Sequence, residues 1–394
     1  MHSVGVDVVT ELERAAARAA ELARSLAEIT EERRSLPPEL VEALRDAGLL
    51  RPAVTEALGG PGLSPGVILR CAEAVARGDG SAGWCVSINA TSSLLSAYLP
   101  EKGAAEVFGD PASVAAGVWA PRGSAHRVDG GVVVSGQWSF CSAISHSDWL
   151  FAGCVLAPGT EGAVPGTVPA ASPDLRVLAV PTAELEVLDT WHTSGLCGTG
   201  SHDAVASEVF VPEHRMMSLL NGPPPGAEPL YRFPVFGFFA LSIAVAALGN
   251  ARGAVDDLVE LAGGKRTLGS SRTLAERAQV QAAVASAEAA LRAARAFLYQ
   301  AVDQAWAAAS ALEPVSNADR VALRLAATHA TRTSAEVVAT LYDLGGGSAI
   351  YRGSPLQRRF RDAHTATAHF QVNPATYELL GRMLLGQPAR TEQL

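Results

Sequence analysis

The chain has 394 residues, of which 48% are hydrophobic and 18% are charged, and its formal net charge at pH 7 is −9. This composition allows a large buried core in two or three domains and argues against disorder. An acidic chain without a basic face is not expected to bind nucleic acid. No uninterrupted apolar run of about 20 residues is present, so we expect no membrane span.

The N-terminal residues do not combine a basic segment with an apolar core, so the sequence predicts no secretory signal and a cytoplasmic protein. The cysteines are odd in number and none has the spacing of a metal site, which favours free thiols in a reducing compartment. The five cysteines are Cys71, Cys85, Cys141, Cys154 and Cys197.

Two regions with helical periodicity open the chain, at residues 7–50 and 65–99. In the first, apolar residues recur at helical spacing, and Pro37-Pro38-Glu39 fits the start of a further helix. The second contains the step Gly83-Trp84. We predict an N-terminal helical domain over residues 1–112.

The pattern changes near residue 113 to short, Val-rich, alternating runs that Gly, Pro and Asp-Gly interrupt, which is typical of strands. Asp129-Gly130-Gly131 lies between two such runs and predicts a hairpin. We predict a β-domain over residues 113–222. Its strands are expected at residues 114–119, 125–128, 131–140, 149–155, 177–180 and 204–211.

Helical periodicity returns after residue 223, most clearly at residues 273–309 and 319–344. These segments are rich in alanine, which allows helices to pack closely. The sequence therefore predicts a C-terminal four-helix bundle over residues 223–394 and an α+β protein overall.

The order of helices, β-domain and helical bundle resembles the acyl-CoA dehydrogenase superfamily, and so does the segment from Leu344 to Phe370. There a glycine cluster precedes Pro355 and the pair Arg361-Asp362. In the dehydrogenases a catalytic Glu follows this pair at a fixed distance. The matching position here is Phe370, with His369 just before it, and this exchange favours oxygen chemistry over dehydrogenation.

A second segment, from Gly136 to Trp149, resembles the strand and turn of the two-component flavin monooxygenases of this superfamily. The resemblance implies that Ser142 lies near flavin N5 and stabilises a C4a-hydroperoxide, and that Trp138 contacts the flavin. Ala143 stands where the family usually has Gly.

The segment from Trp191 to Ser201 resembles a glycine-rich segment of the same family, whose small residues let the backbone approach a cofactor. The resemblance assigns Thr199 and Ser201 to flavin binding. Cys197 stands where Arg is common.

Further flavin contacts are implied nearer the C-terminus. Arg266 and Arg272 are candidates for binding the flavin phosphate, which in the superfamily often happens across a subunit boundary. Gly346 and Gly347 belong to the flavin-anchoring glycine cluster.

His364 and His369 are five residues apart, which does not suit a two-histidine metal site on one helix. We therefore expect no metal. Histidine suits proton transfer near neutral pH, and the family places a catalytic base at His369. His364 is expected to lie beside it.

We expect the substrate pocket next to Trp84. Many phenol hydroxylases of this group carry a histidine several residues beyond the Gly-Trp step, and this chain has none there. The predicted pocket residues are Trp84, Asn89, Ser92, His364 and Phe370.

The resemblance implies the oxygenase component of a two-component monooxygenase that hydroxylates a phenolic or other aromatic molecule. A separate reductase would supply reduced FMN or FAD, with molecular oxygen as co-substrate. The resemblance also implies a homo-oligomer, namely a tetramer. Three alternatives remain open: N-hydroxylation of an amino sugar or oxidation of an indole or sulfur compound, an acyl-CoA dehydrogenase, and a non-catalytic ligand-binding homologue.

Overall fold

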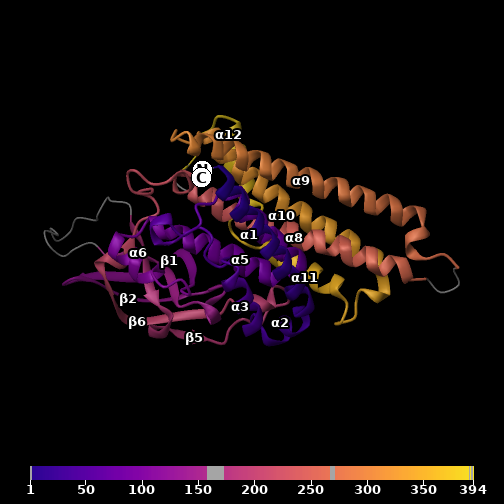
Figure 1. Ribbon diagram of the computed structural model, residues 1–394, viewed down its shortest axis with the longest axis horizontal. Helices are drawn as coiled ribbons and strands as arrows, with labels where there is room; N and C mark the ends of the chain where they lie inside the picture. The colour runs from indigo at the N-terminus through magenta and orange to yellow at the C-terminus, as the bar shows by residue number, and fades with distance from the viewer. Residues whose placement is uncertain (1, 158–172, 267–270, 390, 392–393) are drawn as a thin grey trace.

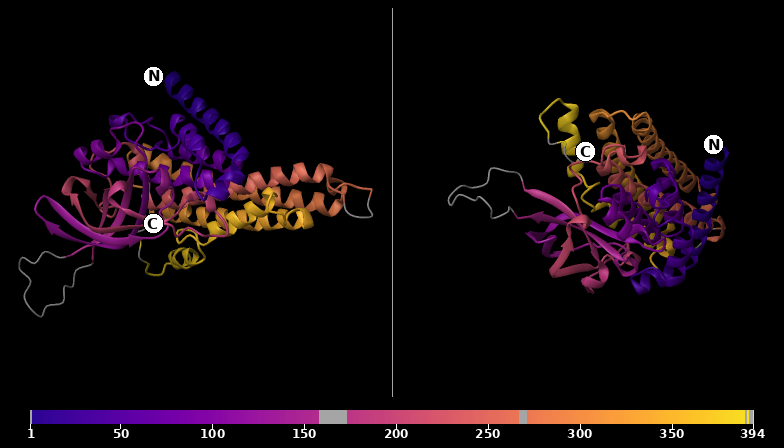
Figure 2. Two further views of the ribbon diagram at one scale, coloured as in Figure 1. Left: turned by 90° about the horizontal axis from the view of Figure 1, so that it is seen from below. Right: turned by 60° about the vertical axis from the view of Figure 1, so that its left-hand side comes forward.

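Helices form both ends of the chain and a sheet forms its middle, as the sequence predicts (Figure 1). The computed structural model describes residues 2–157, 173–266, 271–389, 391 and 394. The β-domain lies at one end of the molecule, and the long C-terminal helices extend away from it to the other end (Figures 1 and 2).

The N-terminal helices begin where the sequence offers start signals. Pro38 and Pro65 occupy the first turns of their helices, where a missing N–H costs nothing. The side chain of Asp79 caps the next helix by accepting a hydrogen bond from Ala82 N at 2.9 Å. The helices are α1 His2–Ser25, α2 Ala27–Arg33, α3 Pro38–Asp46, α4 Pro65–Gly78, α5 Gly80–Ser93 and α6 Glu101–Phe108.

A seven-stranded sheet in the order β5-β6-β2-β1-β3-β4-β7 forms the middle domain. Neighbouring strands are antiparallel except β1 and β3, which are parallel. The predicted hairpin at Asp129–Gly131 joins β1 to β2. The strands are β1 Ala115–Val128, β2 Gly131–Trp138, β3 Trp149–Leu156, β4 Asp174–Pro181, β5 Glu186–Leu188, β6 Asp203–Pro212 and β7 Met216–Met217.

Two strand predictions need correction. The runs predicted at residues 114–119 and 125–128 belong to one strand, β1, whose pairing with β3 shifts in register between Val118 and Gly123. Strand β2 ends at Trp138 and not at Phe140, because the chain leaves the sheet in a tight turn with positive φ angles at Phe140 and Ala143.

The C-terminal half is helical, as predicted. The helix expected from residue 273 begins later, because Thr273 and Glu276 form a capping box around a short 3-10 turn that precedes it. The helices are α7 Pro229–Arg232, α8 Val235–Gly264, α9 Ala278–Ser310, α10 Asn317–Gly345, α11 Pro355–Thr367 and α12 Ala375–Leu384.

The two helical regions share one hydrophobic core, in which the buried faces of α4 and α5 pack against α8. The sheet has a second core that surrounds Trp138. Among the described residues, α8 alone is long and apolar enough to cross a membrane, but 89% of that stretch is buried inside the protein, as in a core helix. The predicted boundaries near residues 112 and 222 fall in connecting segments between helix and strand.

Candidate active site

Four hydrogen bonds connect α5, the turn after β2 and the glycine-rich segment before β6. Trp84 Nε1 donates to Ser142 Oγ at 3.1 Å. Ser142 Oγ lies 2.8 Å from Ser201 Oγ, which lies 2.6 Å from Thr199 Oγ1. Thr199 Oγ1 donates to the carbonyl of Leu196 at 2.8 Å. All four side chains are buried, so three predicted flavin residues and one predicted pocket residue meet in one polar chain.

The turn after β2 has the shape that this arrangement needs. Ala143 N donates to Thr199 O at 2.9 Å, and Cys141 N donates to His202 O at 3.1 Å, so the turn is held against the glycine-rich segment. Ala143 has φ 67° and Phe140 has φ 66°, a region that L-residues seldom occupy. The family's glycine at position 143 would adopt this conformation without strain.

The structure does not support Trp138 as a flavin contact. Its side chain is fully buried in the core of the sheet, and its Nε1 donates to Gly153 O at 2.7 Å. The exposed aromatic face in this region belongs to Phe140, which is 71% exposed and meets Trp191 edge-on at 6.1 Å between ring centroids. Sequence reasoning missed Phe140, and the feature that distinguishes it is an exposed aromatic ring beside Ser142.

His369 lies on the other side of Trp84, just beyond the end of α11. The two rings are T-shaped, with centroids 5.7 Å apart. Gln371 N donates to His369 Nδ1 at 3.3 Å, which assigns the ring proton of neutral His369 to Nε2. Burial, with a smaller effect of Arg324, lowers the pKa of His369 to about 4. The imidazole is therefore neutral at pH 7.

Arg324 on α10 is an unusual neighbour for this histidine. It is only 8% exposed, and burial lowers its pKa to about 10. Arg324 donates to the side-chain and backbone oxygens of Gln371, while its Nε has no partner within the described part of the chain. Its positive charge is thus held by neutral groups, and it disfavours protonation of His369.

Asn89 and Ser92, one turn apart on α5, are fully buried. Asn89 Nδ2 donates to Ala115 O at 2.9 Å, whereas Asn89 Oδ1 and Ser92 Oγ have no partner among the described residues. Buried polar atoms are normally satisfied. These two oxygens are therefore available to a ligand or to water, and the placement of both residues in a pocket stays a prediction.

The structure separates the two histidines. The side chain of His364 is exposed and packs against Phe360 at 4.4 Å between ring centroids, on the side of α11 that meets Tyr342. No contact of His364 with Trp84 is present among the described residues, so its placement in the pocket is not supported. Phe370 is 57% exposed and lies 4.9 Å from the ring of His369, so no carboxylate occupies the position of the dehydrogenase base.

Helix α11 holds the glycine-rich segment in place. Leu196 N donates to Asp362 Oδ1 at 2.6 Å, and Arg361 donates to Ser194 O. Burial and the nearby Asp79 raise the pKa of Asp362 to about 7. Cys197, at the position where Arg is common, is buried and directs its thiol to Thr193 O, so it cannot replace the missing cation.

The remaining predicted flavin residues lie elsewhere. Arg266 and Arg272 follow α8 in the chain, and both are exposed and close enough to lower the pKa of Glu276. Gly346 and Gly347 are exposed at the end of α10, where Lys265 donates to Gly345 O. This end of the bundle is the one opposite the β-domain (Figure 1). One protomer therefore does not bring these four residues to Ser142.

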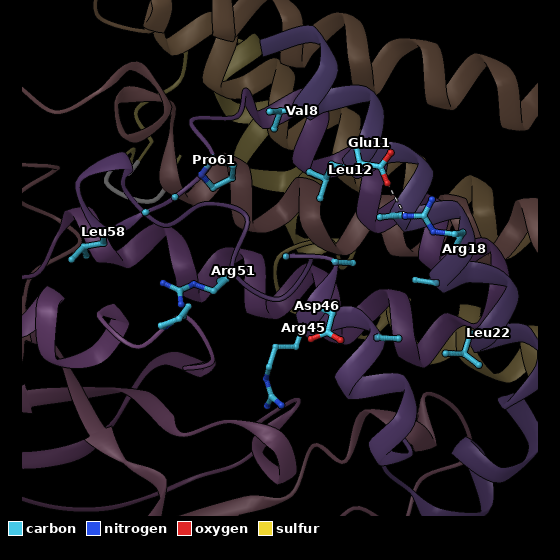
Figure 3. Close-up of a pocket in the computed structure, with 18 of the residues that line it drawn as sticks. Val8, Glu11, Leu12, Arg18, Leu22, Arg45, Asp46, Arg51, Leu58 and Pro61 are labelled. Atoms are coloured by element: carbon cyan, nitrogen blue, oxygen red, sulfur yellow. Dashed lines mark hydrogen bonds and ion pairs between the residues drawn. The ribbon is translucent and has the colours of Figure 1, made fainter. Parts of the chain in front are cut away.

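A separate groove of about 910 Å³ lies between α1, α3 and the loop before α4 (Figure 3). Two of its arginines have partners: Arg18 pairs with Glu11, and Arg51 donates to the carbonyls of Phe108 and Asp110. Arg45 also lines the groove, and its Nε has no partner among the described residues. None of the predicted site residues lines it. Within the described ranges, no group of three metal-binding side chains occurs.

Comparison with known proteins identifies the family to which this fold belongs. Residues 10–107 match the N-terminal domain of acyl-CoA dehydrogenases, and residues 241–374 match a C-terminal domain of the same enzymes. The chain is 35% identical over 355 residues to an indole-3-acetate monooxygenase of Pseudomonas putida, covering 90% of this chain and 88% of the relative. The chain belongs to the flavin-dependent monooxygenases of the acyl-CoA dehydrogenase superfamily.

Other relatives of this monooxygenase support the assignment. The oxygenase component of an FADH(2)-dependent resorcinol hydroxylase from Rhizobium sp. is 31% identical and covers 93% of this chain and 92% of that protein. The structure of XiaF from Streptomyces sp. in complex with FADH2 and glycerol superimposes with a TM-score of 0.89, at 26% identity and coverage of 99% and 98%. A 3-HSA hydroxylase from Rhodococcus sp. RHA1 gives a TM-score of 0.88, at 26% identity and coverage of 98% and 99%.

Proposed function

We propose that this monooxygenase is an oxygenase component that uses reduced FAD to hydroxylate an aromatic small molecule. The observation that carries the proposal is the placement of Trp84 between Ser142 and His369, which brings the expected flavin side and the expected substrate side of the site together. Relatives named as resorcinol hydroxylase and indole-3-acetate monooxygenase support an aromatic substrate.

The residues present fit a flavin ring beside the turn after β2. Phe140 and Trp191 offer aromatic faces at the surface, and Ser142 Oγ retains one lone pair beyond its two hydrogen bonds. Apolar faces with a few fixed polar groups are typical of cofactor sites. When bound there, reduced flavin would supply the electrons that activate molecular oxygen, while Ser142 would orient the reactive edge of the ring through N5.

We propose that His369 acts on the oxygen atom of the substrate. Its lowered pKa keeps the ring neutral, and the Gln371 contact leaves Nε2–H as a hydrogen-bond donor. Such a donor stabilises an ionised phenol oxygen, and an ionised phenol is the stronger nucleophile. Removal of the phenol proton by His369 itself would require loss of the Gln371 contact, because Nδ1 would then carry the ring proton.

A diffusible reduced flavin requires a reductase, which we propose is a separate chain. We also propose a cytoplasmic homo-oligomer, tetrameric as the resemblance implies. Two features support this: the five cysteines are free and buried, and the distant position of Arg266, Arg272, Gly346 and Gly347 would be useful only if these residues bound the flavin of a neighbouring subunit.

The experiment combines the purified protein with a flavin reductase, NADH, FAD and a panel of phenols, and adds indole-3-acetate because of the Pseudomonas relative. We expect substrate-dependent formation of a hydroxylated product and no oxidation of NADH without the reductase. Direct NADH oxidation by the chain with FAD alone would contradict the two-component proposal. An inert chain that still binds reduced FAD would favour the ligand-binding alternative.

A further inference from the structure

The hydroxyl chain through Ser142 has a preferred direction, the one in which every hydrogen bond is made. A carbonyl oxygen can only accept, so Thr199 must donate its single hydroxyl proton to Leu196 O. Thr199 can then only accept from Ser201, and Ser201 can only accept from Ser142. Trp84 Nε1 can only donate, so Ser142 Oγ accepts this hydrogen bond with one lone pair. The hydroxyl proton of Ser142 remains available for donation to Ser201.

The proton of Ser142 is therefore directed inward, towards Ser201. One lone pair of Ser142 remains unused, so Ser142 can accept a further hydrogen bond but cannot donate one. A ligand atom that carries hydrogen suits this group, whereas a ligand atom with only a lone pair does not.

This difference separates the two redox forms of a flavin. N5 of a reduced flavin carries hydrogen and donates, while N5 of an oxidised flavin has only a lone pair. We propose that the chain Thr199–Ser201–Ser142 makes the site prefer reduced over oxidised flavin, and that Ser201 and Thr199 are the positioning residues that set this preference through Ser142. The proposal rests on the proposed function, because it takes N5 to lie at Ser142.

The chain is also able to reverse, which limits the size of the preference. If Ser142 donated outward, Ser201 would donate to Ser142 and Thr199 to Ser201, so Leu196 O would lose one bond. That oxygen would keep Trp191 Nε1 at 3.0 Å and Thr199 N at 3.1 Å. Reversal thus gives up one neutral hydrogen bond, which corresponds to a preference of about 2- to 10-fold.

The test is the ratio of the dissociation constants of FAD and anaerobically reduced FAD, measured by titration without substrate. Ser201→Ala and Thr199→Val break the chain at different links and free the proton of Ser142 to point outward. We expect the ratio to fall about 2- to 10-fold in each variant, mainly through tighter binding of FAD. Thr199→Ser, which keeps the hydroxyl, is the matched control and should retain the parent ratio.

The reduction potential of the bound flavin gives an independent reading of the same quantity. Because about 30 mV corresponds to a tenfold ratio for a two-electron couple, breaking the chain should lower the potential of bound FAD by roughly 9–30 mV. Thr199→Ser should show the parent's potential. This measurement requires no turnover.

The outcomes separate this inference from the function on which it rests. If Ser142→Ala changes the ratio but Ser201→Ala and Thr199→Val do not, the directed chain is wrong and the flavin site at Ser142 stands. If Ser142→Ala changes neither dissociation constant nor the potential, N5 does not lie at Ser142, and the placement of the flavin in the proposed function fails together with the inference.

Discussion

Trp84 Nε1 donates a hydrogen bond of 3.1 Å to Ser142 Oγ and thereby ties α5 to the turn after β2. The same indole meets the ring of His369 edge-on. One buried side chain thus fixes the relative position of the two residues expected to act on flavin and on substrate. Pre-organisation of this kind matters because oxygen transfer needs both reactants at a set distance.

Ser142→Ala should uncouple flavin oxidation from product formation. The variant would lose the neutral hydrogen bond that we propose between Ser142 and N5. Such a bond is worth roughly 0.5–1.5 kcal/mol, so hydrogen peroxide released per flavin oxidised should rise about 2- to 10-fold. The measurement is peroxide against product with the reductase present. Ser145→Ala, which changes an exposed serine in the same turn, is the control. Equal peroxide yields in the parent and Ser142→Ala would remove Ser142 from the mechanism.

His369→Ala should slow product formation about 10²- to 10⁴-fold, the usual contribution of a positioned proton-transfer group, while the affinity for reduced FAD stays near that of the parent. The defect should shrink as the pH approaches the pKa of the phenol, because the substrate then ionises unaided. His369→Gln distinguishes a hydrogen-bond donor from a general base at this position. An amide can donate a hydrogen bond but cannot take up the phenol proton. Retention of most activity in His369→Gln would support the donor role, and an Ala-like loss would support general-base catalysis.

The comparison for these variants is His364→Ala, because His364 is exposed and packs against Phe360. We expect a much smaller effect on the product formed per flavin oxidised. If His369→Ala folded correctly and coupled oxidation to product as well as the parent, His369 would have no role in oxygen transfer.

Arg324→Met should raise the pKa of His369. Arg324 contributes to the lowering of that pKa through its charge, after the larger effect of burial, so removing the charge favours the imidazolium. An NMR titration of the histidine ring protons measures the shift, and His369→Gln identifies the resonance. Arg332→Met changes another arginine of α10 and should leave the resonance of His369 in place. A lower pKa of His369 in Arg324→Met would contradict the charge effect.

Much of this architecture can be read from the sequence, because it depends on local periodicity and on a motif order that covers the chain. Prediction from sequence fails where a single backbone dihedral angle determines the direction of a side chain. Residues two apart on a strand point to the same side, so Trp138 and Phe140 would be equivalent on an uninterrupted strand. The strand ends at Trp138 and Phe140 has a positive φ, so one ring is buried and the other exposed.

Prediction from sequence also fails where the length of a helix determines how far a residue lies from the site. Arg266 and Gly346 are predicted flavin residues by resemblance alone, and they follow the ends of α8 and α10 that lie away from the β-domain. A helix of the length of α8 spans on the order of 45 Å at 1.5 Å per residue. Sequence reasoning assigns residues to a site, but whether one chain can complete that site depends on such lengths.

The pH dependence of stability should report the buried Asp362. Its pKa is raised to about 7 in the folded protein, above the value near 4 of an unfolded chain. The folded state therefore binds the proton more tightly, so this carboxyl contributes stability at low pH that is lost as the pH rises from about 4 to 7. Asp362→Asn abolishes the titration and can still accept from Leu196 N.

We therefore expect the melting temperature of Asp362→Asn, relative to that of the parent, to increase as the pH rises from about 4 to 7 and to stay level above that range. Asp343→Asn, an exposed aspartate on α10, should run parallel to the parent. The low pKa of His369 acts in the opposite direction in both proteins, so it cancels in the difference. A difference that decreased with rising pH would show that the pKa of Asp362 is not raised.

Ala143→Gly should stabilise the protein and identify what the unusual alanine does. Ala143 has φ 67°, and an L-residue in the left-handed region costs roughly 1–2 kcal/mol. Glycine avoids that cost but is more flexible in the unfolded chain by about 0.5–1 kcal/mol. The net gain in the free energy of unfolding should therefore be about 0.5–1 kcal/mol, measurable by denaturant unfolding.

Ala368→Gly, at an exposed position after α11 with an ordinary φ of −78°, is the control and should show no such gain. A loss of stability in Ala143→Gly equal to that in Ala368→Gly would mean that the turn carries no strain at Ala143, and its departure from the family's glycine would then have no energetic consequence.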